Sequence, residues 1–368
     1  MKKIVLVFPQ FLHNKGNLIN AQSDTYYYFK TSIESLNIEH EIIDFETRDN
    51  KIFLNLETFK KIAEKNKDAV FLFEANNYPG DQSFIYPLGL AEVIEKLNLK
   101  TIAIALDIIK EINFNFWLKN SKFLIGTTKS GVKWANNYYD TNKFLFYPTW
   151  PQVKNTDFDT EKFLNRPYDF GYIGSNKIFR INFISSLLRL GSNRLSSIII
   201  SSLRSGSIIN TSDKYQKVLK DCKFFFCTRA ALYEEYENNN SLSYKTEGRY
   251  ANRVSEAISC GCIPIYWQPR IKSSFFGLLE RLLFSKLSKF LFLNNVKGNK
   301  ESLPYDLNKK EQEGFFVAKD TFDAIKIIKN KDIQKIKSSL KFNNNFFEKY
   351  ISPKNFFNFI FFQINDSK

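Results

Sequence analysis

The sequence predicts an α/β protein made of two Rossmann-like domains, each built on a parallel sheet, and three observations lead to this prediction. Short apolar runs alternate with helical patterns along most of the chain. Several of these runs are apolar on both faces, which is typical of parallel strands that helices cover on both sides. The alternation stops at the proline-containing segment 148–151 and then starts again, and 368 residues exceed the usual size of one domain.

The first half of the chain accounts for one such domain, 1–150. Periodicity of two or continuous apolar runs predict strands, and a period near 3.6 predicts helices. The strands expected are 4–8, 40–45, 69–73, 101–106, 123–126 and 144–147, and the helices expected are 23–36, 56–65, 88–97 and 131–139.

The second half repeats the pattern over 151–335, and the helical segment 336–368 is expected to pack back toward the first domain. Two parallel sheets joined by one linker face each other across a cleft, and open α/β folds bind ligands at the carboxyl ends of their strands. The strands expected are 168–173, 197–201, 224–227, 262–267 and 315–317, with helices at 178–190, 215–219, 247–259 and 321–328.

The net charge of +15, from 53 Lys and Arg against 38 Asp and Glu, favours anionic partners. Nucleic acid, an anionic membrane surface and a phosphorylated small molecule all fit such a field. Charge alone does not choose among them, because many of the lysines are scattered along the chain as on an ordinary solvated surface.

Cysteine use and apolar patterning predict a cytoplasmic protein, free or at the inner face of the membrane. The four cysteines form no C-x-x-C pair and there are two histidines, so no zinc site is expected and the thiols are predicted to be small buried groups. The apolar stretch at the N-terminus is too short for a signal peptide, and no run approaches the length of a membrane span.

The most informative segment is 244–267, where a helix leads directly into an apolar strand. At about 100° per residue, the side chains of Arg249, Arg253 and Glu256 fall within an arc of roughly 60°. Gly261 is expected to end the helix in the left-handed conformation. One helix face thus presents two guanidinium groups and a carboxylate.

A nucleoside diphosphate suits this face. Arginine forks match phosphate oxygens, and a carboxylate can accept hydrogen bonds from ribose hydroxyls. Cations beside a diphosphate leaving group also stabilise the charge that grows on it during group transfer. The alternative is that Arg253 and Glu256 form an ordinary ion pair on a solvated helix.

The same segment resembles two groups of enzymes. The run Arg253-x-x-Glu256-Ala257 followed by Gly261-Cys262-Ile263-Pro264 resembles the donor-site signature of GT-B glycosyltransferases, especially exostosin-like and CgeB-like ones. Tyr244-x-Thr246-Glu247 with Ile263-Pro264-Ile265-Tyr266-Trp267 is similar to the donor motif of bacterial fucosyltransferases that use GDP-fucose, except that Gly248 stands where those enzymes have a phosphate-binding lysine. The resemblance implies donor binding by Lys245, Glu247, Arg249, Arg253 and Glu256.

A second donor-binding element is expected where the strand 168–173 runs into Gly174 and Ser175 and then a helix. A helix N-terminus reached through such a turn binds anions with its free N–H groups. By the same resemblance, Arg180, and after it Lys177, would reach the diphosphate. A plain structural turn is the alternative.

The first domain is expected to hold the acceptor and a catalytic base. Glu74 and Asp107 each follow an apolar strand, so their carboxylates are expected to face the cleft, where an inverting enzyme needs a group to deprotonate the attacking hydroxyl. Glu74 ranks first and Asp107 second. A helix cap or a loop hydrogen bond is the alternative role for each, and His13 is expected to be a surface residue or an acceptor contact.

The sequence therefore predicts a hexosyl or fucosyl transferase that moves a sugar from a nucleotide-diphosphate donor to a hydroxyl of a glycan or glycolipid, with no metal and no cofactor beyond the nucleotide-sugar co-substrate. An inverting enzyme using GDP-fucose is the rival within enzymes. A basic nucleic-acid-binding protein and a catalytically silent GT-B subunit are the rivals from other classes. The segment 275–293 is a candidate interfacial patch, and the C-terminal phenylalanines are expected to pack a terminal helix onto the core.

Overall fold

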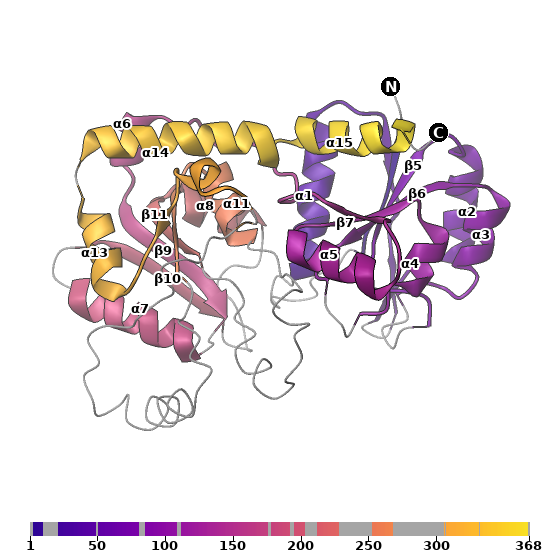
Figure 1. Ribbon diagram of the computed structural model, residues 1–368, viewed down its shortest axis with the longest axis horizontal. Coiled ribbons are helices and arrows are strands. Elements are labelled where there is room, and N and C mark those ends of the chain that lie inside the picture. The colour runs from indigo at the N-terminus through magenta and orange to yellow at the C-terminus, as the bar shows by residue number, and fades with distance from the viewer. Residues whose placement is uncertain are drawn as a thin grey trace.

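The computed structural model describes residues 3–9, 21–48, 51–80, 85–108, 112–175, 178–191, 195–202, 212–227, 252–267, 305, 307–330 and 332–366. These residues form two units side by side, each a parallel sheet with helices around it (Figure 1). The predicted fold class, an α/β chain with two parallel sheets, is confirmed.

The first sheet has six strands in the order β2-β1-β5-β6-β7-β8, and every neighbouring pair is parallel. Strands β1, β5 and β7 are buried at every residue, as expected for runs that are apolar on both faces. The strands are β1 (Ile4–Val7), β2 (His40–Ile42), β5 (Val70–Glu74), β6 (Lys100–Ala105), β7 (Phe123–Gly126) and β8 (Phe144–Phe146).

Helices cover both faces of this sheet. One face carries α2 (Leu56–Lys65), α3 (Leu90–Lys96), α4 (Asn115–Asn120) and α5 (Lys129–Tyr138), and the other carries α1 (Ala21–Ser35) with the final helix α15 (Pro353–Asp366). The short antiparallel pair β3 (Glu46–Arg48) and β4 (Lys51–Phe53) was not expected, because strands of three residues carry little periodicity.

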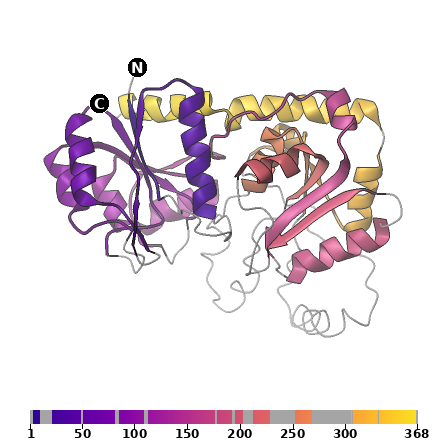
Figure 2. The ribbon, with the colours of Figure 1, turned by 180° about the vertical axis from the view of Figure 1, so that it is seen from behind.

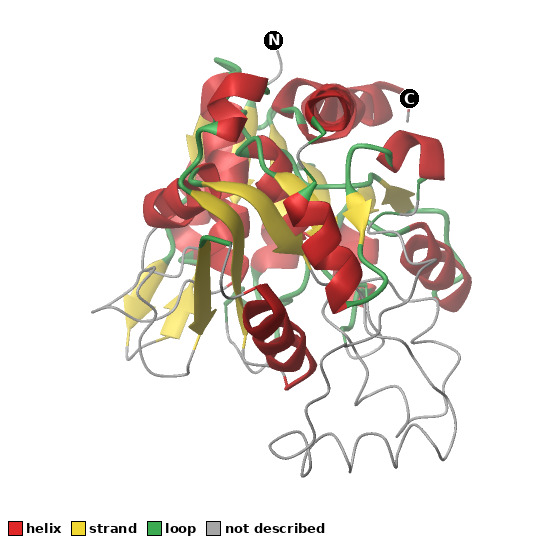
Figure 3. Ribbon diagram, turned by 90° about the vertical axis from the view of Figure 1, so that its left-hand side faces the viewer, coloured by secondary structure: helices red, strands yellow, loops and turns green. Residues whose placement is uncertain are grey.

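The second sheet has five strands in the order β10-β9-β11-β12-β13, again all parallel. Helices flank it on both sides, as the view from this unit shows (Figure 3). The strands are β9 (Tyr168–Ser175), β10 (Ser197–Ser202), β11 (Cys222–Cys227), β12 (Ile263–Tyr266) and β13 (Phe316–Val317). The helices are α6 (Thr160–Leu164), α7 (Ile178–Gly191), α8 (Ser212–Lys220), α11 (Asn252–Ser259) and α13 (Thr321–Lys329), with a short 3-10 turn at Lys309–Gln312. All four cysteines are free and buried, as predicted.

The C-terminal segment connects the two units along one edge (Figure 2). Helix α14 (Ile333–Phe346) packs on the second unit, a π-helical turn (Phe347–Ile351) follows, and α15 packs on the first. The linker runs beside this turn, because the Gln152 N–H donates to the Ile351 carbonyl at 3.0 Å. Most C-terminal phenylalanines are buried or half-buried, as predicted, although Phe362 is 60% exposed. Among the described residues, no helix has the length and apolarity that a membrane crossing requires.

Each sheet has one point where the strand order reverses direction. In the first sheet it lies between β1 and β5, and in the second between β9 and β11. The carboxyl ends of strands beside such a point are the usual ligand sites of open α/β sheets. Beside these two points, Glu74 ends β5, Ser175 ends β9 and Cys227 ends β11.

Candidate functional site

The centre of the candidate site is an ion pair on α11. Arg253 Nη1 lies 2.8 Å from Glu256 Oε2, and the side chain of Glu256 is 1% exposed while that of Arg253 is 28% exposed. The two residues therefore share one helix face, as their spacing predicts. The alternative, an ordinary ion pair on a solvated helix, is wrong because the carboxylate of Glu256 is buried.

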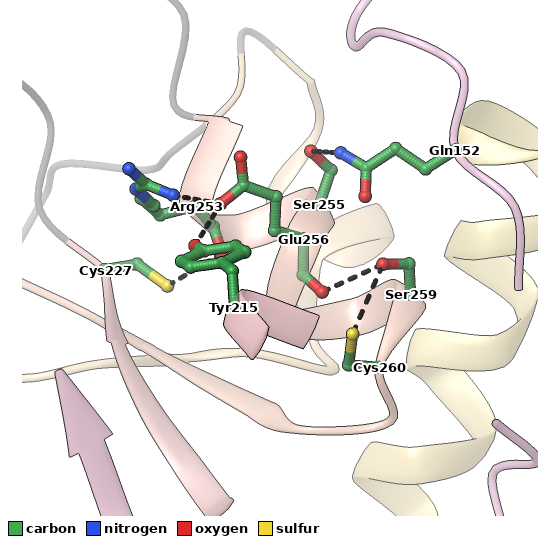
Figure 4. A network of polar contacts seen from close by, with 8 residues as sticks. All are labelled: Gln152, Tyr215, Cys227, Arg253, Ser255, Glu256, Ser259 and Cys260. Carbon is green, nitrogen blue, oxygen red and sulfur yellow. Dashed lines mark hydrogen bonds and ion pairs between the residues drawn. The ribbon is translucent and has the colours of Figure 1, made fainter. Parts of the chain in front are cut away.

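Tyr215 of α8 completes the cluster. Its hydroxyl donates to Glu256 Oε2, the same oxygen that Arg253 contacts, and the Arg253 guanidinium lies over its ring, 4.8 Å from the centroid. The three side chains point toward one another from two neighbouring helices (Figure 4). A cation above an aromatic face and beside a carboxylate is held in place by both contacts.

The other oxygen of the same carboxylate is the unusual atom. Glu256 Oε1 is buried and has no hydrogen-bond partner within the described part of the chain. A buried acceptor without a partner costs about 1–3 kcal/mol, so such atoms are rare in folded proteins and call for an explanation. A ligand hydroxyl would supply the missing donor.

Local sequence explains why α11 holds this position. Val254, Ala257 and Ile258 form its buried face. The Cys227 thiol, at the end of β11, donates to the Arg253 carbonyl at 3.3 Å, which fixes the start of the described helix against the carboxyl end of the sheet. The cluster therefore lies at the edge of the sheet where ligands usually bind.

The C-terminal end of α11 is closed as predicted by Gly261, which has a φ of 68°. The Gly261 N–H donates to the Ile258 carbonyl and the Cys262 N–H to the Ala257 carbonyl, both at 2.8 Å. This pair of bonds is a Schellman motif. Arg166 adds a cation at this end by donating to the Cys260 carbonyl at 2.8 Å, which suits the negative end of the helix dipole.

The interdomain linker also contacts α11. Gln152 Nε2 donates to Ser255 Oγ at 3.1 Å, and both residues are buried (Figure 4). Ser255 precedes Glu256 directly, so the segment that joins the two units lies one residue from the buried carboxylate.

The remaining donor-binding predictions divide into two groups. Gly174 and Ser175 end β9, which pairs with β11 beside the reversal point, and Arg180 lies in the first turn of α7. The strand and the helix are thus placed as expected. Lys177, Lys245, Glu247 and Arg249 lie outside the described residues.

In the first unit, Glu74 is more enclosed than expected. Its side chain is 1% exposed; Oε1 accepts from the Asn76 N–H at 2.7 Å and Oε2 from Asn77 Nδ2 at 2.5 Å. Burial raises the pKa of this carboxyl to about 7, and the two asparagines oppose that rise only in part. The loop after β5 folds back over the carboxylate instead of leaving it open, and Trp117 Nε1 anchors the loop by donating to the Asn77 carbonyl at 2.8 Å.

Asp107 is half-buried and lies beside this loop. Asn76 links the two strand ends, because its Oδ1 accepts from the Leu106 N–H at 2.8 Å and its Nδ2 donates to the Asp107 carbonyl at 3.4 Å. The negative charge of Asp107 also contributes to the raised pKa of Glu74. The structure therefore brings the two predicted catalytic carboxylates together at one edge of the first sheet. Their catalytic role stays a prediction.

Sequence reasoning missed Tyr215, Gln152, Asn76 and Asn77. Tyr215 lies on an amphipathic helix and Gln152 lies in the linker, and neither belongs to a recognisable sequence motif. The two asparagines at the second and third positions after Glu74 were the one available signal, since amide groups often satisfy a buried carboxylate.

No family model and no curated protein matches this sequence. Solved structures do match across nearly the full chain. A glycosyltransferase from Rickettsia africae ESF-5 is 11% identical, with coverage of 96% of this chain and 95% of that one and a TM-score of 0.47. AviGT4, a glycosyltransferase involved in avilamycin A biosynthesis, is 9% identical, with coverage of 95% and 96% and a TM-score of 0.45. Acinetobacter baumannii MurG is 6% identical, with coverage of 94% and 95% and a TM-score of 0.38.

Proposed function

We propose that this chain is a glycosyltransferase of the GT-B type, which moves a sugar from a nucleotide-diphosphate donor bound by its second unit to a hydroxyl of a glycan or glycolipid. The observation that carries the proposal is the buried carboxylate of Glu256. One of its oxygens is held by Arg253 and Tyr215, and the other is left without a partner in the described part of the chain. Its position at the carboxyl edge of a parallel sheet is where a nucleotide would bind.

The chemistry divides between the two charged side chains. Glu256 Oε1 accepts a hydrogen bond from a ribose hydroxyl, which satisfies the buried acceptor. The guanidinium of Arg253 carries five N–H donors and reaches the diphosphate from the more exposed side of the pair. As the glycosidic bond breaks, negative charge grows on the diphosphate, and a fixed cation stabilises that charge.

The end of β9 and the start of α7 contribute a second part of the donor site. Gly174 and Ser175 bring the chain to the N-terminus of a 14-residue helix, whose free N–H groups favour an anion. Arg180 and Lys177 would add charge there, and Lys245, Glu247 and Arg249 would complete the contacts to the nucleotide and the sugar.

The acceptor would bind at the facing edge of the first unit, where Glu74 and Asp107 are the candidates for the catalytic base. A carboxyl with a pKa of about 7 exchanges its proton at neutral pH, as a general base requires. Asp107 is the more exposed of the two, so an acceptor hydroxyl would reach it more readily than it would reach Glu74.

The test is thermal and calorimetric titration with UDP, GDP and CMP, and then with their sugars, in buffer containing a chelator. A nucleotide at 100 times its dissociation constant should stabilise the protein by about 2.7 kcal/mol. The matched variants are Arg253→Ala, which should abolish this stabilisation, and Arg189→Ala on the exposed end of α7, which should keep it. GDP-specific stabilisation would favour the fucosyltransferase alternative, and nucleotide binding without sugar release or transfer would favour a silent subunit. No nucleotide binding, together with salt-sensitive binding of DNA or RNA, would reject the proposal.

A further inference from the structure

A cavity of about 350 Å³ lies between the two units, beside the linker. The first unit contributes one wall from α1, and the linker and α8 contribute the other. Its lining residues are Tyr27, Tyr28, Thr31, Glu34, Ser35, Gln152, Val153, Asn155 and Gln216. The volume is at the lower end of the range of about 300–1,000 Å³ that small-molecule sites occupy.

The lining has a chemistry different from that of the donor cluster. Among the residues that the structure describes, the lining combines two tyrosines with hydroxyl and amide side chains and a single carboxylate, and it includes no lysine or arginine. A phosphate or a nucleotide diphosphate requires cationic partners, so this wall disfavours both. Neutral polyhydroxylated molecules suit it, because their C–H faces pack on phenol rings while their hydroxyls pair with amides and a carboxylate.

We propose that this cavity is a second binding site, distinct from the donor site, and that it takes a neutral saccharide. A bound saccharide would touch α1 of one unit and α8 of the other. It therefore stabilises the arrangement of the two units in which α1 and α8 face each other across the cavity.

Two short paths, each through one intervening residue, connect the cavity to the donor cluster. Gln216 lines the cavity, and its neighbour Tyr215 donates to Glu256. Gln152 lines the cavity and donates to Ser255, the residue before Glu256. Binding in the cavity is therefore coupled to nucleotide affinity, and by linkage the nucleotide changes saccharide affinity by the same factor. This coupling, unlike the binding itself, rests on the proposed function.

The experiment is saturation-transfer NMR with glucose, galactose, maltose and lactose at millimolar concentration, without nucleotide, and with inorganic phosphate as competitor. Saturable binding of at least one sugar is expected, and phosphate should not displace it. Thr31→Phe fills the cavity and should weaken binding at least tenfold, whereas Thr58→Phe on the exposed surface of α2 should not change it. Gln216→Ala removes a lining amide without adding bulk and should also weaken saccharide binding. Lys217→Ala, at an exposed position of the same helix, is its control and should leave binding unchanged.

Absence of binding by all four sugars, or binding that survives both Thr31→Phe and Gln216→Ala, overturns the proposal. If the saccharide binds but no nucleotide does, the cavity stands and the proposed glycosyltransferase function fails. If both bind, the nucleotide dissociation constant measured with saturating saccharide should shift severalfold, and the shift should vanish in Thr31→Phe. An unchanged constant overturns the coupling.

Discussion

Two glutamates with equal burial lie near the carboxyl edges of the two sheets, and their surroundings differ. Glu74 and Glu256 are each 1% exposed. Both oxygens of Glu74 accept from asparagine N–H groups, whereas Glu256 receives an arginine and a tyrosine on one oxygen and leaves the other without a partner among the described residues. Neutral donors satisfy the first carboxylate within one loop, whereas a cation and a hydroxyl hold only one oxygen of the second. Equal burial therefore goes with different partners, and the partners are what the following predictions test.

The largest effect is expected from removing the cation. Arg253→Ala leaves Glu256 buried without its charged partner, which should lower the free energy of unfolding by about 2–3 kcal/mol, less than for a fully buried pair because Arg253 is 28% exposed. Urea denaturation measures this loss. In the Glu256→Gln background the same substitution should cost much less, and equal costs in the two backgrounds would show that the pair contributes nothing.

The Glu74 side of the comparison predicts a pH dependence of stability. Its pKa is raised from 4.5 to about 7, so the native state keeps a proton that the unfolded state loses. The free energy of unfolding should therefore fall as pH rises from 4.5 to 7. The raised pKa corresponds to a loss of at most about 3 kcal/mol, and we expect about 2 kcal/mol because relaxation of protein and solvent around the ionised carboxylate reduces the effect. Glu74→Gln resembles the protonated acid and should flatten this part of the curve.

The measurement is chemical denaturation at half-unit steps from pH 4.5 to 7.5. Glu64→Gln, at an exposed position of α2, is the matched control and should leave the curve unchanged. A wild-type slope equal to that of Glu74→Gln would mean that Glu74 is ionised throughout and that the loop does not neutralise it.

Substitution of Gly261, at the C-terminal end of α11, tests how much the cap of the helix that carries Glu256 contributes to stability. Gly261 has a left-handed φ of 68°, and a Cβ there would lie 2.6 Å from Thr156 Cγ2 and 2.8 Å from Arg166 Nη2. Gly261→Ala should therefore lower the free energy of unfolding by about 2 kcal/mol. Gly80 has a φ of 88° and its nearest such contact is at 3.8 Å, so Gly80→Ala should cost only about 1 kcal/mol. Equal losses would mean that Thr156 and Arg166 move aside freely.

The sequence alone supports the two sheets, the shared face of Arg253 and Glu256, and the cap at Gly261, because each depends on local periodicity or local backbone preference. It does not predict how the loop after β5 covers Glu74, because that depends on Trp117, forty positions further along the chain. The contact of Tyr215 with Glu256 joins residues 41 positions apart on two helices. Such contacts arise from packing between elements, which no motif encodes.

The smallest effect, and the most specific one, is expected at Tyr215. Tyr215→Phe removes the hydroxyl from Glu256 Oε2 but keeps the ring under Arg253, so it should weaken nucleoside diphosphate binding by about 1 kcal/mol, or roughly fivefold. Tyr215→Leu also removes the ring and should weaken binding further. Calorimetry with whichever of UDP, GDP and CMP binds the wild-type protein measures both effects, and Tyr138→Phe, at a residue that is 58% exposed, is the control. If Tyr215→Phe lowers thermal stability while nucleotide affinity stays at the wild-type value, the tyrosine only packs the helices. A loss of affinity larger than the loss of stability instead makes it a positioning residue, because the hydroxyl then acts through the carboxylate that the ligand contacts.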